Sequence, residues 1–384
     1  MLRSLFSRSA PVRVQPFFGF RNGERLFLNA RAIRAAEPSF ARQGFWGNFR
    51  TMLSQYASRE VADLPVTLEY HCGENALISE RVVSDAEGFV RFDLRIDPAC
   101  PPPDRTRWEK AVLRWEEPGE EGKQAGTPRE ASAYILTPGE QTRTGIISDI
   151  DDTILETGIT GNVRQIARNW KRVMTTMPSE RAIVPHARDF YAAIGGDPAQ
   201  DTGAAGETRG PRARVRPVFY VSSSPWNLFS YLVAFKRQRN LPLGPVMLRD
   251  WGFNRKTLGS EGHGSHKEAA IARILDMFPH LRFALIGDDS QKDMVAFGNI
   301  AAQRSGRIAA IFIRAVSGEP LSDKEIEARK RIEKADVPFW TGDDYRAATE
   351  FLLASGLELE GGVEPLVRTA SEGTAEEPKD SAAA

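Results

Sequence analysis

The chain has 384 residues, and its 51 Lys and Arg residues balance its 51 Asp and Glu residues, so the formal net charge is zero. This balance gives no whole-chain attraction to nucleic acid or to acidic surfaces, and we therefore expect no nucleic-acid partner. With 41% hydrophobic residues, the chain can fill the cores of two domains, or of one domain with large insertions.

Residues 1–10 are basic and precede the first acidic residue, Glu24. They lack the continuous apolar segment of a secretory signal, and no later stretch approaches the ~20 apolar residues of a membrane span. We expect a frayed tail here, with weak contact to a membrane surface as the alternative. Cys72 and Cys100 could pair, but two cysteines do not make a disulfide framework. These features favour a reducing, cytoplasmic location, with peripheral membrane contact as the alternative.

Residues 11–140 carry short segments that alternate between apolar and polar residues, notably 66–70 and 88–96. Turn-forming residues such as Gly23 and Pro118 separate such segments. Several short alternating strands predict a small β-sandwich domain. The segment near 40–60 reads instead as a helix inserted between strands.

From residue 141 to 355, continuous apolar runs alternate with helical patterns, which predicts an α/β domain. The runs are 145–147, 218–221, 283–286 and 308–313, and the predicted helices include 162–174, 225–239 and 266–278. This alternation indicates a Rossmann-like parallel sheet with helices on both faces, and ligands of such sheets lie beyond the carboxyl ends of the strands. Residues 195–216 read as a flexible insertion, and 356–384 as a disordered tail.

The first chemical motif follows the run 145–147 and contains Asp149, Asp151 and Thr153. Alternate spacing at a strand end lets two carboxylates face one site, where a divalent cation offsets their repulsion. Oxygen-only ligands favour Mg²⁺, and one carboxylate is then able to attack phosphorus while the other handles a proton. The simpler interpretation is an acidic loop with Thr153 as a helix N-cap.

The second motif, Ser222 and Ser223 before Pro225, follows the run 218–221. Hydroxyl groups beside a helix start suit a phosphate, although a plain N-cap has the same residues. In the third motif, Lys267 begins an amphipathic helix, where a cation is disfavoured unless an anion lies nearby. A solvated surface lysine is the alternative.

The fourth motif places Asp288, Asp289 and Asp293 after the run 283–286. An ordinary turn is its simpler interpretation. The four motifs nevertheless come in an order that brings them to one edge of one sheet. Together they supply a nucleophile, a proton donor, phosphate ligands, a neutralising charge and metal ligands, which are what phosphoryl transfer needs.

These four motifs, in this order, resemble those of the haloacid dehalogenase superfamily of phosphatases. Residues 145–315 resemble more narrowly the actin-patch type of phosphatidate phosphatases, relatives of the lipins, including their bacterial members. The resemblance rests on the segments 148–153, 219–228, 249–252, 266–267 and 286–293. With the β-rich front region it covers most of residues 15–345.

The resemblance implies that Asp149 is the nucleophile, Asp151 the general acid and base, and Lys267 the charge-stabilising residue. It implies substrate-binding roles for residues of the first two motifs, namely Thr153, Ser222 and Ser223. It implies that Mg²⁺ is held by Asp149, the backbone carbonyl of Asp151, Asp288 and Asp293. Many relatives have Ser-Gly where this chain has Asp289-Ser290, which leaves open whether Asp289 or Asp293 is the nearer metal partner.

The implied reaction is hydrolysis of phosphatidate to diacylglycerol and phosphate through an aspartyl-phosphate. Two alternatives remain: a phosphatase of a soluble phosphomonoester, and a binding or scaffold protein with a silent phosphatase fold. The intact acid pair at Asp149 and Asp151 argues against the second alternative. The sequence does not determine the oligomeric state.

Overall fold

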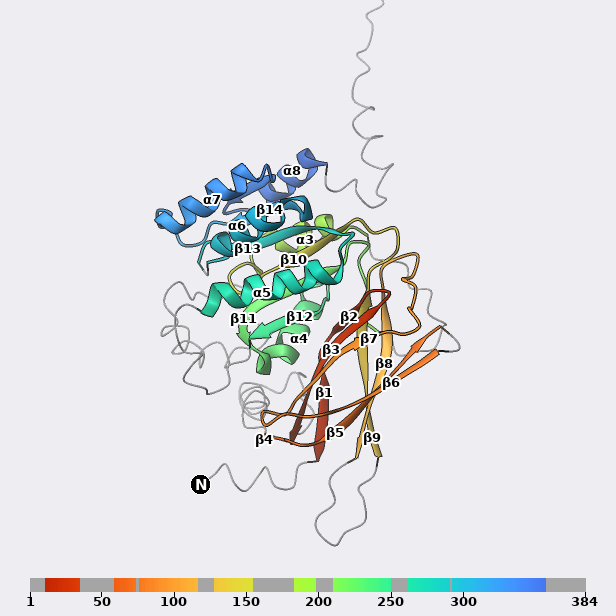
Figure 1. Cartoon of the computed structure of the whole chain (residues 1–384). Helices are drawn as coiled ribbons and strands as arrows, with labels where there is room; N and C mark the ends of the chain where they lie inside the picture. The colour runs from red at the N-terminus through yellow and green to blue at the C-terminus, as the bar shows by residue number, and fades with distance from the viewer. Residues whose placement is uncertain are drawn as a thin grey trace, which may run out of the picture.

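The computed structural model describes residues 11–34, 59–73, 76–116, 128–154, 183–197, 210–249, 262–290 and 292–356, which form two sheets with associated helices (Figure 1). The predicted tail 1–10, the helix 162–174, and most of the insertion 195–216 and of the tail 356–384 lie outside these residues. The predicted helix near 40–60 also lies outside them, except for its last two residues. Those two, Arg59–Glu60, form strand β4 instead, because they pair with a neighbouring strand.

The front region forms one nine-stranded sheet. Its strands are β1 (Val12–Pro16), β2 (Gly19–Arg21), β3 (Arg25–Arg34), β4, β5 (Pro65–Cys72), β6 (Ala76–Val83), β7 (Phe89–Arg95), β8 (Arg107–Glu116) and β9 (Pro128–Thr137). The order is β1-β3-β2-β9-β8-β5-β6, with β4 and β7 also paired to β3. The expected β-rich domain is therefore present, but its strands form a single hydrogen-bonded sheet around one apolar core rather than two separate sheets.

A disulfide joins Cys72, at the end of β5, to Cys100, in the segment after β7. The sequence had left this pairing open. Because disulfides persist mainly in oxidising compartments, the pairing gives no support to the reducing compartment that the low cysteine count favoured.

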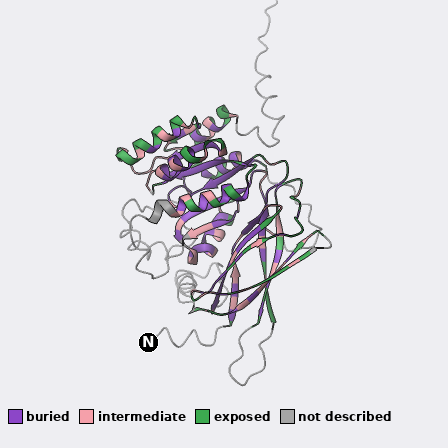
Figure 2. Ribbon diagram, in the orientation of Figure 1, coloured by how far each residue is buried: buried purple, intermediate pink, exposed green. Residues whose placement is uncertain are grey.

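The second sheet has six strands: β10 (Thr144–Ser148), β11 (Val218–Pro225), β12 (Val246–Arg249), β13 (Arg282–Asp288), β14 (Ile308–Arg314) and β15 (Phe339–Gly342). Their order is β12-β11-β10-β13-β14-β15, and every neighbouring pair is parallel. The four apolar runs predicted as strands are confirmed as β10, β11, β13 and β14. These strands are buried along most of their length because both faces of the sheet are covered (Figure 2).

Six helices of the described residues cover the two faces of this sheet. One face carries α3 (Ala187–Gly195), α4 (Phe229–Gln238) and α8 (Tyr345–Ser355), and the other carries α5 (Gly262–Met277), α6 (Asp293–Arg304) and α7 (Asp323–Lys334). Successive strand residues alternate between the faces, so Ile146 packs with the first group and Ile147 with the second. The predicted parallel sheet with helices on both faces is confirmed. Helix α4 begins later than predicted, because Trp226–Leu228 form a 3₁₀ turn.

The two sheets belong to one packed body, because aromatic side chains of the front domain enter the cores of the second domain. Phe17 and Phe89 join the core beneath α3, α4 and α8. Phe20 and Phe27 join the core beneath α5 and α6. The front domain is therefore docked on the α/β domain through apolar surface.

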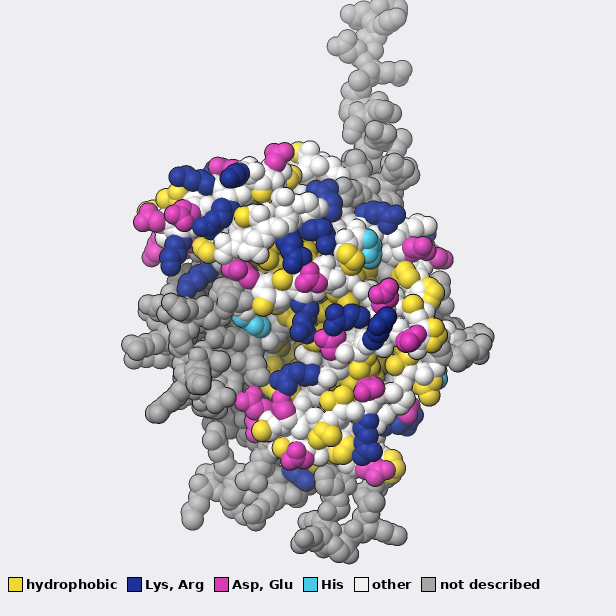
Figure 3. Space-filling model, viewed as in Figure 1, with side chains coloured by type: hydrophobic (Ala, Val, Ile, Leu, Met, Phe, Trp, Pro, Cys, Tyr) yellow, Lys and Arg dark blue, Asp and Glu magenta, His cyan; other side chains and the backbone are white. Residues whose placement is uncertain are grey.

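The exterior mixes both signs of charge, and Figure 3 shows Lys and Arg side chains interspersed with Asp and Glu over one face. Within the described residues, none of the helices has the length and apolar character that crossing a bilayer requires.

A buried ion pair lies inside the front domain between β2 and β8. Arg21 Nε and Nη2 donate to the Glu109 carboxylate at 2.6 and 2.9 Å, and the hydroxyls of Tyr70 and Thr137 donate to it at 2.6 and 2.7 Å. Burial raises the pKa of Glu109, but the hydrogen bonds and charge of Arg21, with the two hydroxyl donors, outweigh burial and lower the pKa to about 2.

We expect Glu109→Gln to lower the free energy of unfolding at neutral pH by about 3–5 kcal/mol, because Arg21 keeps a buried charge without its partner. The carboxylate of Glu109 stabilises the fold fully above its ordinary pKa of 4.5, and this stabilisation is lost as the pH falls toward about 2. Urea unfolding across this range should show the gap between the two proteins closing. A constant gap would contradict the assignment.

Candidate active site

The candidate site lies at the carboxyl ends of β10 and β13, the two central strands of the parallel sheet. From β10 the chain winds outward to β11 and β12, then returns to β13 on the other side of β10. Such a reversal opens a crevice at the strand ends where ligands bind. Asp149 follows β10 directly, and its backbone N–H donates to the Ile286 carbonyl of β13 at 2.8 Å.

Three carboxylates converge at this point. One oxygen from each of Asp149, Asp288 and Asp293 lies within 4.8 Å of the other two, and all three side chains are buried. Asp149 comes from the end of β10, Asp288 from the end of β13, and Asp293 from the first residue of α6. The sequence predicted that these residues meet, and the structure brings them together.

Lys267, in α5, is the cation of this cluster. Its Nζ lies 2.9 Å from Asp149 Oδ1 and is also hydrogen-bonded to Asp293. Burial would lower the pKa of Lys267, but the charges of Asp149, Asp293 and Asp288 outweigh it and hold the pKa above its usual value. The ammonium therefore stays charged. The prediction that Lys267 begins the helix is wrong, because α5 begins at Gly262, but carboxylates do lie beside the lysine.

Burial and mutual repulsion destabilise the charged forms of the three carboxylates. Burial raises the pKa of Asp149 well above its usual value; Lys267 counters this effect, and the charges of Asp293 and Asp288 add to it. Burial and the charge of Asp293 raise the pKa of Asp288 to about 7. One lysine does not neutralise three buried carboxylates, so the cluster favours a further cation.

The residues of the cluster fit a hard divalent ion such as Mg²⁺. All the candidate ligands are oxygens, and the three carboxylates with Lys267 leave a formal charge of two negative units for the ion to neutralise. Asp149 Oδ1 is buried and faces the Lys267 ammonium at 2.9 Å, so this oxygen already takes part in the charge balance of the cluster. The backbone carbonyl of Asp151 was predicted as a further metal ligand. The side chain of Asp151 does not belong to the cluster and is bound by serine hydroxyls instead.

Thr153, predicted from the first motif as a substrate-binding residue, lies beside the carboxylate cluster. Its side chain is fully buried, and its hydroxyl donates to Asp288 Oδ2 at 3.0 Å and lies 3.5 Å from Asp149 Oδ2. Its backbone carbonyl accepts a hydrogen bond from the Tyr345 hydroxyl at 2.9 Å. Thr153 therefore links two carboxylates of the cluster, and its substrate-binding role stays a prediction.

Asp151 is held by serines of the second motif. The hydroxyls of Ser222 and Ser224 each donate to Asp151 Oδ2 at 2.8 Å, and the Ser224 N–H donates to Ser222 Oγ at 3.0 Å. Burial raises the pKa of Asp151, and these two hydroxyls partly counter the rise. The sequence predicted Ser222 and Ser223 but missed Ser224, because three consecutive serines give no signal of which ones turn toward the site. Ser223 is half-buried at the same strand end.

The choice between Asp289 and Asp293, open in the sequence, has a geometric answer. Asp289 Oδ1 accepts the backbone N–H groups of Val316 and Ser317 at 2.7 and 2.9 Å, and its Oδ2 accepts the Ser317 hydroxyl at 2.9 Å. Asp293 lies in the carboxylate cluster and accepts the Asp288 N–H at 3.2 Å. Asp289 thus caps the segment after β14, and Asp293 is the acid near the candidate metal position.

The front domain reaches the second motif through Trp226. The Arg31 guanidinium carbon lies 3.0 Å from the centre of the Trp226 ring, and the Phe89 ring meets Trp226 edge-on at 5.6 Å. Trp226 is two residues beyond Ser224, so β3 and β7 support the strand end that carries the serines. The sequence gave no indication of this contact, because its partners are more than 130 residues apart.

Comparisons with known proteins match the segment of the chain that contains this site. Residues 144–315 match the model of the family described as phosphatidate phosphatase APP1, catalytic domain. The chain is 30% identical over 186 residues to phosphatidate phosphatase APP1 of Saccharomyces cerevisiae, which covers 47% of this chain and 28% of that protein. It is also 25% identical over 177 residues to an uncharacterized protein of Schizosaccharomyces pombe. This match covers 45% of this chain and 25% of that protein.

The chain spans about a quarter of the length of these curated relatives. The matched segment contains the whole carboxylate cluster, Lys267 and the serines, and leaves out the front domain. The resemblance to the phosphatidate phosphatase family is thus supported for residues 144–315, while the wider superfamily stays a prediction. A solved calcium-binding mutant of Bacteroides uniformis beta-glucuronidase 2 covers 91% of this chain and 39% of its own at 10% identity, but its TM-score of 0.25 supports no conclusion about the fold.

Metal binding should distinguish the two acids of the fourth motif. We expect Asp293→Asn to weaken Mg²⁺ binding at least about tenfold, because it removes one charge of the cluster. Asp289→Asn is the matched control, and it should retain Mg²⁺ affinity while losing some thermal stability. Isothermal titration of both variants measures the affinities. An equal loss of Mg²⁺ affinity in the two variants, or a loss only in Asp289→Asn, would contradict the assignment of Asp293 as the metal partner.

Proposed function

We propose that this chain is a Mg²⁺-dependent phosphatase that hydrolyses phosphatidate to diacylglycerol and phosphate, with Asp149 as the nucleophile. The observation that carries the proposal is the buried cluster of Asp149, Asp288, Asp293 and Lys267 inside the segment that matches the catalytic-domain model. The order of the four motifs and the doubly wound parallel sheet support the further proposal that the domain belongs to the haloacid dehalogenase superfamily.

In the first proposed step a carboxylate oxygen of Asp149 forms a bond to phosphorus, and the bond between phosphorus and the glycerol oxygen breaks. The leaving oxygen takes a proton from Asp151, which Ser222 and Ser224 hold in place. This step yields diacylglycerol and an aspartyl-phosphate on Asp149.

In the second step a water molecule attacks the phosphorus and gives a proton back to Asp151, which now acts as the base. The bond between Asp149 and phosphorus breaks, and inorganic phosphate leaves. Lys267 lies 2.9 Å from the nucleophilic carboxylate and stabilises the negative charge that spreads over the phosphoryl oxygens.

Mg²⁺, when bound by Asp149, Asp288, Asp293 and the Asp151 carbonyl, supplies charge neutralisation for the phosphoryl group. Thr153 orients two of these carboxylates through its buried hydroxyl. The phosphatidate substrate requires contact with a membrane surface, and a peripheral encounter from the cytoplasm is part of the proposal.

Asp149→Asn should reduce phosphate release to background, since the amide is a poor nucleophile and loses the charge that the cluster needs. The measurement is phosphate release from phosphatidate in mixed micelles and from a panel of soluble phosphomonoesters, with Mg²⁺ and with chelator. Asp289→Asn, a neighbouring change of the same chemistry, should retain activity. Full activity of Asp149→Asn would refute the nucleophile, and a clear preference for soluble esters would refute the lipid substrate. No Mg²⁺-dependent turnover of any ester would favour a silent site.

Removing the hydroxyls that hold Asp151 should slow the reaction without preventing metal binding. We expect Ser222→Ala and Ser224→Ala each to lower kcat by about tenfold, a fraction of the ~10²–10⁴ typical of a whole acid–base group. Ser355→Ala, which removes a hydroxyl bonded to Leu352 at the far end of α8, is the control. Unchanged kcat in Ser222→Ala and Ser224→Ala would show that Asp151 needs no such support.

A further inference from the structure

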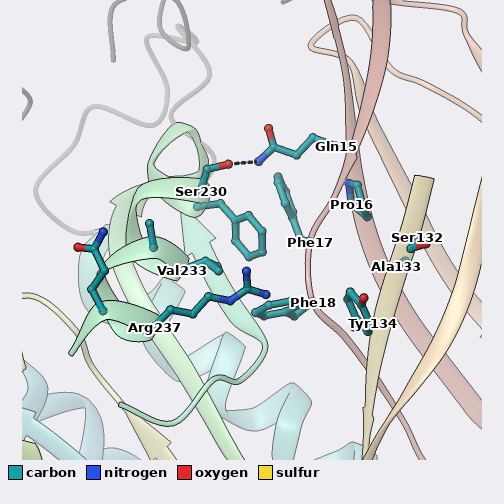
Figure 4. Close-up of a pocket in the computed structure, with 13 residues that line it drawn as sticks. Gln15, Pro16, Phe17, Phe18, Ser132, Ala133, Tyr134, Ser230, Val233 and Arg237 are labelled. Carbon is teal, nitrogen blue, oxygen red and sulfur yellow. Dashed lines mark hydrogen bonds between the residues drawn. The ribbon is translucent and has the colours of Figure 1, made fainter. Parts of the chain in front are cut away.

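An apolar groove runs between the front domain and α4, and it is lined by 13 residues around a cavity of about 480 Å³ (Figure 4). One wall comes from the front domain and the other from one face of α4. The lining residues are Gln15, Pro16, Phe17, Phe18, Ser132, Ala133, Tyr134, Phe229, Ser230, Val233, Ala234, Arg237 and Gln238. The volume falls within the about 300–1,000 Å³ of small-molecule sites.

The groove is separate from the carboxylate cluster, since none of its lining residues belongs to that cluster. Its first α4 residue, Phe229, follows the 3₁₀ turn after the second motif, and the groove continues along the helix to Gln238. Nine steps at 1.5 Å per residue make its length about 14 Å. An elongated ligand fits this shape better than a compact one.

Aromatic rings form the floor of the groove. The Phe17 ring lies 4.7 Å from the Phe229 ring, and the Phe18 ring lies 5.5 Å from it. Val233 and Ala234 extend the apolar surface along α4. At one end Gln15 Nε2 donates to Ser230 Oγ at 2.7 Å, which ties the two walls together (Figure 4).

Arg237 is the one charged residue among the 13 that line the groove, and none of them is acidic. The Arg237 side chain is exposed and reaches toward Phe18 in Figure 4. Within the residues that the structure describes, its guanidinium makes no hydrogen bond or ion pair. The groove therefore joins a long apolar wall to a single cation that is available to an anion.

We propose that this groove binds a long-chain fatty acid, with the carboxylate at Arg237, the nearer part of the hydrocarbon chain along Phe18, Phe229 and Val233, and the far end of the chain outside the groove. Charge complementarity selects an anionic head, since guanidinium and carboxylate form a bidentate pair. The apolar length of the groove selects the chain, because its burial contributes about 0.8 kcal/mol per CH₂. The proposal does not depend on which phosphate ester the site at Asp149 hydrolyses.

The test uses the full chain with oleate, at concentrations below micelle formation, displacing a fluorescent fatty acid. Wild-type protein should bind oleate saturably at one site. Arg237→Gln should weaken oleate binding about tenfold, the effect of one charge-assisted hydrogen bond, and leave binding of oleyl alcohol unchanged. Ala234→Trp should fill the groove and remove binding of both ligands.

Arg188→Gln, an exposed arginine on α3, is the charge-matched control and should bind oleate like the wild type. Thermal unfolding of each variant, together with turnover of a soluble phosphate ester, separates loss of the groove from loss of the fold or of the proposed activity. Absence of saturable oleate binding to wild-type protein would overturn the proposal. So would oleate binding that Arg237→Gln leaves unchanged, or displacement of oleate by inorganic phosphate.

Discussion

Three buried carboxylates share one space with a single lysine, and this concentration of negative charge constrains the rest of the α/β domain. Asp149 and Asp288 come from adjacent strand ends, so the register of β10 and β13 fixes their spacing. Lys267 and Asp293 come from helices on one face of the sheet, and both helices must stay packed for the ion pair to form. Burial raises the pKa of each carboxyl, and a divalent cation, if bound there as proposed, would offset that cost.

The front domain is coupled to this arrangement through the second motif. Arg31 and Phe89 enclose Trp226, and the serines just before it hold Asp151, so packing between the domains bears on the position of the proposed acid and base. The same interface forms the groove along α4. A domain that the sequence left without a role is thus in contact both with the second motif and with a separate apolar site.

Sequence patterns predicted the parallel sheet and most of the site because both depend on local signals. Fully apolar runs mark buried strands, and polar residues directly after them mark the sheet edge, which was enough to place Asp149 and Asp288. Lys267 was singled out instead by its place in an amphipathic helix, where a cation near the helix start indicated a nearby anion. Asp289 and Asp293 were indistinguishable, since both are acids near one strand end and only the cap on the segment at 316–317 separates them. The burial of Thr153 against Asp288 depends on tertiary packing, which its place in the first motif did not reveal. The single nine-stranded sheet and the Arg21–Glu109 pair depend on contacts between strands that are distant in sequence, which the alternation of apolar and polar residues does not specify.

The most direct test of the proposed chemistry is to trap the phosphoryl group on the protein. A single turnover with phosphatidate labelled in its phosphate, quenched in acid and analysed by peptide mass spectrometry, locates any covalent phosphate. Asp151→Asn removes both the acid of the first step and the base of the second, so it should lower the rate at which labelled phosphate appears on the protein. We expect phosphate on the peptide that contains Asp149, attached to the Asp149 carboxylate. Phosphate on another residue, or full turnover with no phosphorylated protein at any time, would contradict it.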